Sequence, residues 1–221
     1  MKFVDWGMID YKEAWDKQRL IAEKIIAAKG RPEQDGQRII FCEHPHVYTL
    51  GRHGKAHNLL INNDFLERIN ARYYQVDRGG DITYHGPGQL VCYPLLDLER
   101  LHYGLKRYIF ILEEIVIKTL QHYGIKAQRL AGATGVWIDA GKTTARKICA
   151  IGVRASHFVT MHGFALNVNT GLDYYRHINP CGFTDKGVTS MQHETGKPGD
   201  MAGIKAQLRR HFAATFLNDG F

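Results

Sequence analysis

The sequence lacks any apolar run of about 18 residues, the length that a membrane-spanning helix needs. Residues 1–11 also lack a basic start followed by an apolar stretch, and they contain Asp5 and Asp10, so we do not expect a secretory signal peptide. Four cysteines in 221 residues are too few for a disulfide scaffold. We therefore expect a cytoplasmic protein with free thiols and no membrane partner.

Blocks of five or more like charges are also missing, although the formal net charge is +7. A positive balance can serve solubility alone, or it can attract an acidic partner. Because the basic residues are scattered, nucleic acid is not favoured over an acidic protein as that partner. The sequence contains no internal repeat, low-complexity segment or linker, which favours one compact domain over residues 1–221.

Hydrophobic periodicity predicts three helices and several strands. Helices are expected at residues 11–26 after an N-cap at Asp10, at Leu105–Tyr123 and at Met201–Leu217. Strands are expected in six apolar segments: Arg38–Cys42, Tyr73–Val76, Leu90–Leu96, Gly135–Asp139, Lys147–Arg154 and Phe158–Val168. Strand pairs and helices that do not alternate regularly indicate an α+β or mixed α/β domain.

The most informative segment is the glycine-dense stretch Arg78-Gly-Gly-Asp-Ile-Thr-Tyr-His-Gly-Pro-Gly-Gln-Leu90. Glycine lets the backbone turn sharply and approach a ligand closely. The stretch also holds several functional side chains between two predicted strands, which favours a substrate-binding loop held by a sheet. The alternative is a solvent-exposed turn, but plain turns are shorter and need no such side chains.

Two residues could carry covalent chemistry. Cys181 lies in Asn179-Pro-Cys-Gly182, where a rigid corner would present the thiol, whereas a loop cysteine without a role is an equal alternative on local sequence. Lys147 begins an otherwise apolar strand and is read first as an exposed edge charge. If it instead faces Cys181, its ammonium would lower the thiol pKa and exchange protons during acyl transfer.

Two further motifs have weaker readings. Cys42, His44 and His46 alternate, but Pro45 interrupts the strand and the spacing is not that of a zinc site, so we expect no metal. In Thr160–Asn167 a strand with a bulge at Gly163 is the simple reading. The functional reading is a wall of a narrow apolar pocket, with Thr160 and His162 near its mouth.

Taken together, these segments resemble the lipoyl(octanoyl) transferase family. The stretch from Arg78 to Leu90 is similar to the family signature, and further matching motifs occur in the family order over about residues 40–185. These motifs are His44-Pro-His-Val-Tyr-Thr-Leu-Gly51, Gly135-Val-Trp137, Lys147-Ile-Cys-Ala-Ile-Gly-Val-Arg154, His162-Gly-Phe-Ala-Leu-Asn167 and Asn179-Pro-Cys-Gly182.

The resemblance implies an acyltransferase with the catalytic-domain fold of biotin and lipoate protein ligases, a mixed sheet flanked by helices. Cys181 would accept the acyl group as a thioester and Lys147 would activate it, without a cofactor. The acyl site would be lined by three segments, which are Arg78, Gly79, Gly80, Asp81, Ile82, Thr83, Tyr84 and His85; Ala150, Ile151 and Gly152; and Gly163, Phe164 and Ala165. Asp81 has no implied catalytic role, and His85 and Tyr84 would shape the mouth.

The partners implied by the resemblance are octanoyl–acyl carrier protein as donor and lipoyl domains as acceptors. The acceptors would be E2 subunits of 2-oxoacid dehydrogenases and the glycine cleavage H protein. Two alternatives stay open on the residues: an ATP-dependent lipoate ligase on the same fold, which would not need Cys181, and a non-catalytic polyanion-binding module, which would show salt-dependent binding and no acyl-enzyme.

Overall fold

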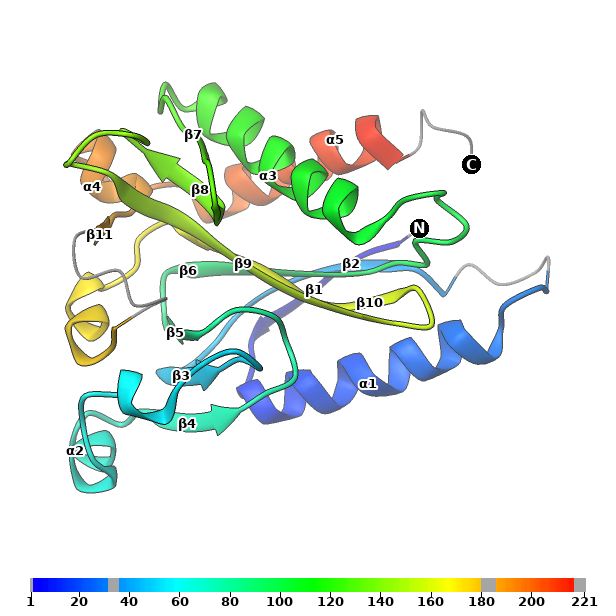
Figure 1. The fold of residues 1–221 in the computed structure, drawn as a ribbon. Coiled ribbons are helices and arrows are strands. Elements are labelled where there is room, and N and C mark those ends of the chain that lie inside the picture. Colours follow the sequence, from blue (N-terminus) through cyan, green and yellow to red (C-terminus); the bar gives the residue numbers. More distant parts are fainter. Residues whose placement is uncertain (1, 32–35, 180–185, 217–221) are drawn as a thin grey trace.

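The computed structural model describes residues 2–31, 36–179 and 186–216 of the chain. Its centre is an eight-stranded mixed sheet in the order β1-β2-β6-β10-β9-β8-β7, with β11 paired to β9 (Figure 1). The strands are β1 Lys2–Met8, β2 Arg38–Glu43, β6 Gln89–Leu95, β7 Gln128–Leu130, β8 Ala133–Ile138, β9 Arg146–Ser156, β10 Val159–Asn167 and β11 Gly187–Val188. The β1–β2 and β11–β9 pairs are parallel, whereas the other pairs are antiparallel.

A second, three-stranded sheet has the order β4-β3-β5. Its strands are β3 Val47–Leu50, β4 Arg72–Gln75 and β5 Ile82–His85. Short helices accompany the two sheets: η1 Ala56–Asn58, α2 Asn63–Arg68, η2 Leu172–His177 and α4 Met191–Thr195. The small sheet lies on the same side of the large sheet as α1, beside that helix (Figure 1).

Three long helices cover the large sheet. Helix α1 (Tyr11–Ala27) lies on one face, and α3 (Leu105–His122) and α5 (Met201–Phe216) lie on the other (Figure 1). Strand β2 serves both faces because successive side chains of a strand point in opposite directions. Ile39 and Phe41 join the core under α3 and α5, while Ile40 and Cys42 join the core under α1.

The three predicted helices and the main strands are confirmed. Asp10 caps α1 as expected, because its carboxylate accepts hydrogen bonds from the backbone N–H groups of Lys12 and Glu13. The bulge expected at Gly163 is wrong: β10 pairs with β9 without a register shift, and Gly163 lies opposite Gly152. None of the described helices is both long enough and apolar enough to cross a bilayer.

The loop predicted between residues 78 and 90 is partly wrong. Residues 82–85 form strand β5, which pairs antiparallel with β3 in the register Val47↔His85 and Leu50↔Ile82. The glycines flanking this strand gave a local signal for a loop, but pairing with a segment more than 30 residues earlier in the chain overrides it. The strand fixes the side chains of residues 82–85 in alternating directions, which decides which of them reach the site.

Candidate active site

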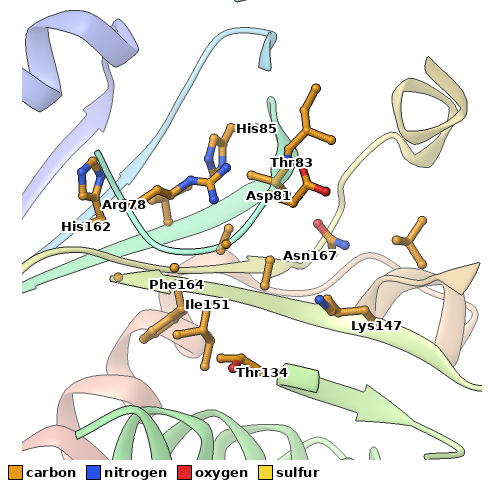
Figure 2. A pocket seen from close by; sticks show the side chains of 18 of the residues that line it. Arg78, Asp81, Thr83, His85, Thr134, Lys147, Ile151, His162, Phe164 and Asn167 are labelled. Atoms are coloured by element: carbon orange, nitrogen blue, oxygen red, sulfur yellow. Dashed lines mark hydrogen bonds between the residues drawn. The ribbon is translucent and has the colours of Figure 1, made fainter. Parts of the chain in front are cut away.

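A cavity of about 350 Å³ is bounded by β9 and β10 on one side and by residues 78–85 on the other (Figure 2). Most of the predicted site residues line it. The predicted residues in the lining are Arg78, Gly80, Asp81, Ile82, Thr83, His85, Lys147, Ala150, Ile151, Gly152, His162, Gly163, Phe164 and Ala165. Residues 78–85 and the consecutive strands β9 and β10, more than 60 residues later in the chain, therefore meet at one cavity.

The turn at residues 78–80 lies directly against strand β9. The N–H of Gly79 donates to the carbonyl of Val153 at 2.9 Å. A Cβ on Gly152 would come within 2.9 Å of the Gly79 carbonyl oxygen and 3.0 Å of Arg78 Cδ. Glycine at position 152 is therefore what allows this close approach.

The buried Arg78 side chain attaches the same turn to strand β3. Its Nη2 donates to the carbonyl oxygen of Thr49 at 2.6 Å and to the Thr49 hydroxyl at 2.9 Å. Its Nη1 also donates to the Gly79 carbonyl at 3.0 Å. The charge of Arg78 is thus used to fix the wall of the cavity, because a planar guanidinium can bond several acceptors at once.

Lys147 marks one end of the cavity, which we call the lysine end and define by Lys147, Trp137 and Val188. Lys147 is half-buried, and at this position β9 has a neighbour on each side, with Trp137 of β8 and Val188 of β11 as register partners. Its Nζ lies 4.7 Å from the centroid of the Trp137 ring, a distance typical of a cation–π contact. The reading of Lys147 as an exposed edge charge is therefore wrong.

Glycine at position 135 lets β8 approach β9 closely. A Cβ on Gly135 would come within 2.6 Å of the Cys149 carbonyl oxygen, and Gly135 has a φ of +121°, which other residues rarely adopt. The motif Gly135-Val-Trp137 thus allows the close approach of β8 to β9 and supplies the ring under the Lys147 ammonium group.

Cys181 lies outside the described residues, as do Pro180 and Gly182. The described residues on either side are Asn179 and Lys186, and Lys186 lines the cavity. The N–H of Asn179 donates to the carbonyl of Asn58 at 2.9 Å, and the Asn58 amide donates to the Asp81 carboxylate at 2.6 Å. The chain that leads to Cys181 is therefore tied, through Asn58, to the wall of the cavity.

The opposite end of the cavity, which we call the histidine end, is defined by Tyr11, His85, Tyr93 and His162. In Figure 2, His85 and His162 lie on the side of the cavity away from Lys147. All four side chains are at most 7% exposed. His85 Nδ1 bonds Gln89 Oε1 at 2.7 Å, and burial lowers the pKa of His85 to about 3. His85 is therefore a neutral wall residue at physiological pH.

His162 is held by a carboxylate. Its Nε2 lies 2.8 Å from Asp77 Oδ1, and Asp77 also pairs with Arg154. Burial alone would raise the pKa of Asp77, but the hydrogen bond to His162 and the Arg154 charge hold it well below its ordinary value. Burial lowers the pKa of His162, against the opposing effect of Asp77. His162 has a φ of +60°, an uncommon conformation that packing around it must maintain.

Of the predicted site residues that the structure describes, three do not line the cavity. Tyr84 follows the alternation of β5 to the opposite side, where its hydroxyl bonds His46 at 2.7 Å. Thr160 is fully buried, and its hydroxyl donates to the Pro94 carbonyl at 2.7 Å, which ties β10 to β6. Gly79 is not in the lining; its N–H bonds the Val153 carbonyl of β9. His85 lies at the buried end, so the expectation that it shapes the mouth is wrong too.

Several lining residues were not predicted as site residues. They are Tyr11, Val91, Tyr93, Gly132, Ala133, Thr134, Trp137, Asn167, Tyr175, Lys186, Gly187 and Val188. Trp137 and Asn167 belong to motifs that signalled the family, so those motifs could have identified them. Tyr11 gave no such signal, because a tyrosine on the apolar stripe of a helix is ordinarily a core residue.

The Cys42–His44–His46 pattern is used for hydrogen bonds. His44 bonds the Ile9 carbonyl and the Tyr93 hydroxyl, each at 2.7 Å. Burial lowers the pKa of His44 to about 4. Within residues 2–31, 36–179 and 186–216, no group of three or more potential metal ligands comes together.

With this geometry in place, the chain can be compared with known proteins. Residues 10–213 match the model of the lipoyl protein ligase A/B catalytic domain family. The chain belongs to this family. An octanoyltransferase of Bacteroides fragilis strain YCH46 is 56% identical over 214 residues, covering 97% of each protein. An octanoyltransferase of Bacteroides thetaiotaomicron is 57% identical over 205 residues, covering 93% of this chain and 90% of the relative.

The family fold is also found in distant solved structures. A bipartite lipoate protein ligase of Thermoplasma acidophilum, studied with its E2 lipoyl domain, superposes with a TM-score of 0.69 at 15% identity. The superposition covers 97% of this chain and 82% of that protein. This likeness confirms the expected fold, a mixed sheet flanked by helices as in the ligases. At this identity it shows the fold alone.

Proposed function

We propose that the protein transfers an octanoyl group from acyl carrier protein to a lysine of a lipoyl domain, through a thioester on Cys181. The observation that carries this proposal is the near full-length identity of 56% to an octanoyltransferase. The cavity supports it, because one end holds a half-buried lysine and the lining includes the apolar residues Val91 and Ala165. The reaction makes octanoylated protein, the precursor of protein-bound lipoate.

In the first half-reaction, the Cys181 thiolate attacks the thioester carbonyl of the donor. The carbon–sulfur bond to the carrier breaks, and the carrier leaves as a thiolate that is protonated to a thiol. Lys147 accepts the thiol proton of Cys181 and returns a proton to the leaving sulfur. One thioester replaces another, so the step is nearly thermoneutral and needs no ATP.

In the second half-reaction, the neutral amine of the acceptor lysine attacks the Cys181 thioester. A carbon–nitrogen bond forms, the carbon–sulfur bond breaks, and Cys181 leaves as a thiolate. The proton lost by the amine passes to the thiolate or to Lys147. Because an amide is more stable than a thioester, this step is downhill, and the two steps predict ping-pong kinetics.

The acyl chain would lie between strands β9 and β10 and the turn at residues 78–80. Each methylene removed from water there contributes roughly 0.8 kcal/mol. Backbone N–H groups of the glycine-containing segments are the candidates for stabilising the tetrahedral oxyanion, which is usually a large term in acyl transfer. This assigns recognition to the cavity walls and bond making to Cys181 and Lys147.

The donor is proposed to be an acidic carrier protein because cations adjoin the cavity. Arg52 and Lys55 are exposed on a loop that is bonded to the cavity wall. The N–H of Arg52 donates to the Arg78 carbonyl at 3.0 Å, and the N–H of His53 donates to the Gly80 carbonyl at 3.2 Å. A net charge of +7 adds a long-range attraction for such a donor.

The proposed acceptors are the lipoyl domains of 2-oxoacid dehydrogenase E2 subunits and the glycine cleavage H protein. The Thermoplasma ligase of the same fold was studied with its E2 lipoyl domain. We place the reaction in the cytoplasm, where thiols stay reduced; the three described cysteines, Cys42, Cys92 and Cys149, are free thiols.

Intact-mass spectrometry after mixing the protein with octanoyl–acyl carrier protein tests the proposal. We expect a mass increase of one octanoyl group on the native protein, none on Cys181→Ser, and transfer to a lipoyl domain without ATP. Modification that strictly requires ATP and free octanoate would instead identify a ligase. Salt-dependent polyanion binding without any acyl-enzyme would identify a binding module.

A further inference from the structure

A second pocket, of about 520 Å³, adjoins the histidine end of the cavity. It is lined by polar residues that include Asp10, Glu67 and Arg72, and by the rings of His46 and Tyr74. Among the described residues, Tyr11 is shared by the linings of both the cavity and this pocket. Tyr11 therefore lies between the two spaces, and we call it the partition.

We propose that Tyr11 ends the path of the acyl chain and so sets the longest chain that the protein accepts. This inference rests on the proposed function, since it concerns the acyl group bound in the same cavity. It assigns a specificity-determining role to a residue outside all the motifs that signalled the family. The second pocket is then the space that a longer acyl chain would enter if the Tyr11 ring were removed.

The Tyr11 ring is fixed between other rings. It stacks on His85 at 5.7 Å between centroids with an interplanar angle of 12°, and on Tyr74 at 5.9 Å and 21°. The edge of His44 meets it at 5.3 Å. The side chain is 2% exposed. A ring with three such neighbours cannot swing aside without breaking several contacts at once.

The backbone of Tyr11 is fixed as well. Tyr11 is the first residue of α1, directly after the N-cap Asp10, whose Oδ1 accepts the first N–H groups of the helix. Asp10 Oδ2 pairs with Arg72 Nη1 at 2.9 Å. The helix start is thereby attached to strand β4, which also carries Tyr74. The partition is built from a helix and a strand rather than from a loop.

The position of Tyr11 matches the far end of an acyl chain. Chemistry at Lys147 places the thioester at the lysine end, so the chain extends past Ala150 and Ala165 toward His85. Lys147 and His85 lie on opposite sides of the cavity (Figure 2). Tyr11 lies against the ring of His85 at that end. Beyond it come Tyr74 and the Asp10–Arg72 ion pair, which would let a longer chain pass along an aromatic surface before it reaches polar groups.

The test compares donors of increasing length, octanoyl, decanoyl, dodecanoyl and tetradecanoyl carrier protein, in transfer to a lipoyl domain. The readout is the ratio of kcat/KM for dodecanoyl to that for octanoyl. We expect Tyr11→Ala to raise this ratio about tenfold or more, the effect of burying roughly two further methylenes. Tyr11→Leu, which leaves a smaller gap, is expected to raise it less and serves if the alanine variant does not fold.

Two control variants isolate the partition. Tyr11→Phe keeps the ring and is expected to leave the ratio unchanged. Glu67→Ala enlarges the second pocket at an exposed residue away from the rings around Tyr11, so it too is expected to leave the ratio unchanged. The proposal is overturned if a folded Tyr11→Ala or Tyr11→Leu variant shows the native ratio, or if Glu67→Ala raises the ratio as much as they do.

Failure of this inference is distinguishable from failure of the proposed function. A native protein that transfers octanoyl groups, with variants that all share its chain-length profile, overturns the role of Tyr11 and leaves the function intact. A native protein that transfers no acyl group from any donor overturns both.

Discussion

The lysine end and the histidine end of the cavity differ in how they hold their polar groups. At the histidine end, side chains are at most 7% exposed, and burial keeps the His85 ring neutral. At the lysine end, Lys147 is half-buried against the face of Trp137, and Lys186, the first described residue after Cys181, lines the same cavity. One end is closed and keeps the His85 ring neutral, and the other, on the proposed function, exchanges protons with bound substrates.

On the proposed function, this difference places recognition of the acyl chain at one end of the cavity and bond making at the other. An acyl chain needs a closed, neutral end, because each buried polar group without a partner would cost free energy. A transferase that serves two protein substrates needs its nucleophile where both can reach it. Because the closed end for the acyl chain and the accessible nucleophile would lie at opposite ends of one cavity, neither requirement limits the other.

Replacing the lysine should give the largest effect. We expect Lys147→Met to slow acylation of Cys181 by at least about 100-fold, the ordinary range for loss of a general acid–base group. Lys142→Met is the matched control, because Lys142 is 69% exposed and pairs with Asp139. Stopped-flow or quenched-flow acylation measures the rate.

The same variant should also raise the apparent pKa of the Cys181 thiol, since a nearby ammonium stabilises the thiolate. The rate of thiol alkylation as a function of pH measures that shift. An unchanged pH profile in Lys147→Met would remove Lys147 from the activating role and would weaken the contrast between the two ends.

Removing the arginine under the cavity wall should have the next largest effect. Arg78→Met loses the charged hydrogen bonds to Thr49 and Gly79, and bonds to a charged group are each worth roughly 1.5–3 kcal/mol. We expect the free energy of unfolding to fall by about 3 kcal/mol in urea denaturation. Arg176→Met, at an 81% exposed side chain, should change it by less than about 0.5 kcal/mol. Equal losses would show that the wall does not depend on Arg78.

Acidification should lower the free energy of unfolding by a smaller amount, through the histidine end. The pKa of His85 is about 3 in the folded protein, against an ordinary value of 6.5. Below pH 6.5 the unfolded chain therefore binds a proton that the native protein does not, so stability falls as the pH falls. Between pH 7 and pH 5 we expect His85 alone to account for a loss of about 2 kcal/mol.

Urea denaturation at several pH values measures this loss. His85→Gln should reduce the slope of stability against pH, whereas the exposed His53→Gln should leave it unchanged. A native protein whose stability is independent of pH over this range would contradict the description of the histidine end as neutral.

Much of the site could be predicted from local sequence, and the exceptions have one cause. The segments 78–85, 150–152 and 163–165 were implied by the family resemblance of their motifs, and all of these residues except Gly79 and Tyr84 line the cavity. Tyr84 and Thr160 were misplaced because the direction of a strand side chain depends on which strands pair, and pairing partners are far away in the sequence. Tyr11 was missed because its neighbours in space, His85 and Tyr74, are more than 60 residues away.

The sequence by itself determined the family, the long helices, most strands of the large sheet and the two residues proposed to make and break bonds. The helices and strands follow from residue types at short spacing, such as periodic apolar side chains and an N-cap, whereas the family and the two proposed residues follow from the resemblance of several motifs in one order. Only the tertiary structure decided that residues 82–85 form a strand, that Lys147 lies over Trp137, and that Tyr11 divides the acyl cavity from a second pocket. Such features depend on contacts between distant segments, which local spacing does not encode.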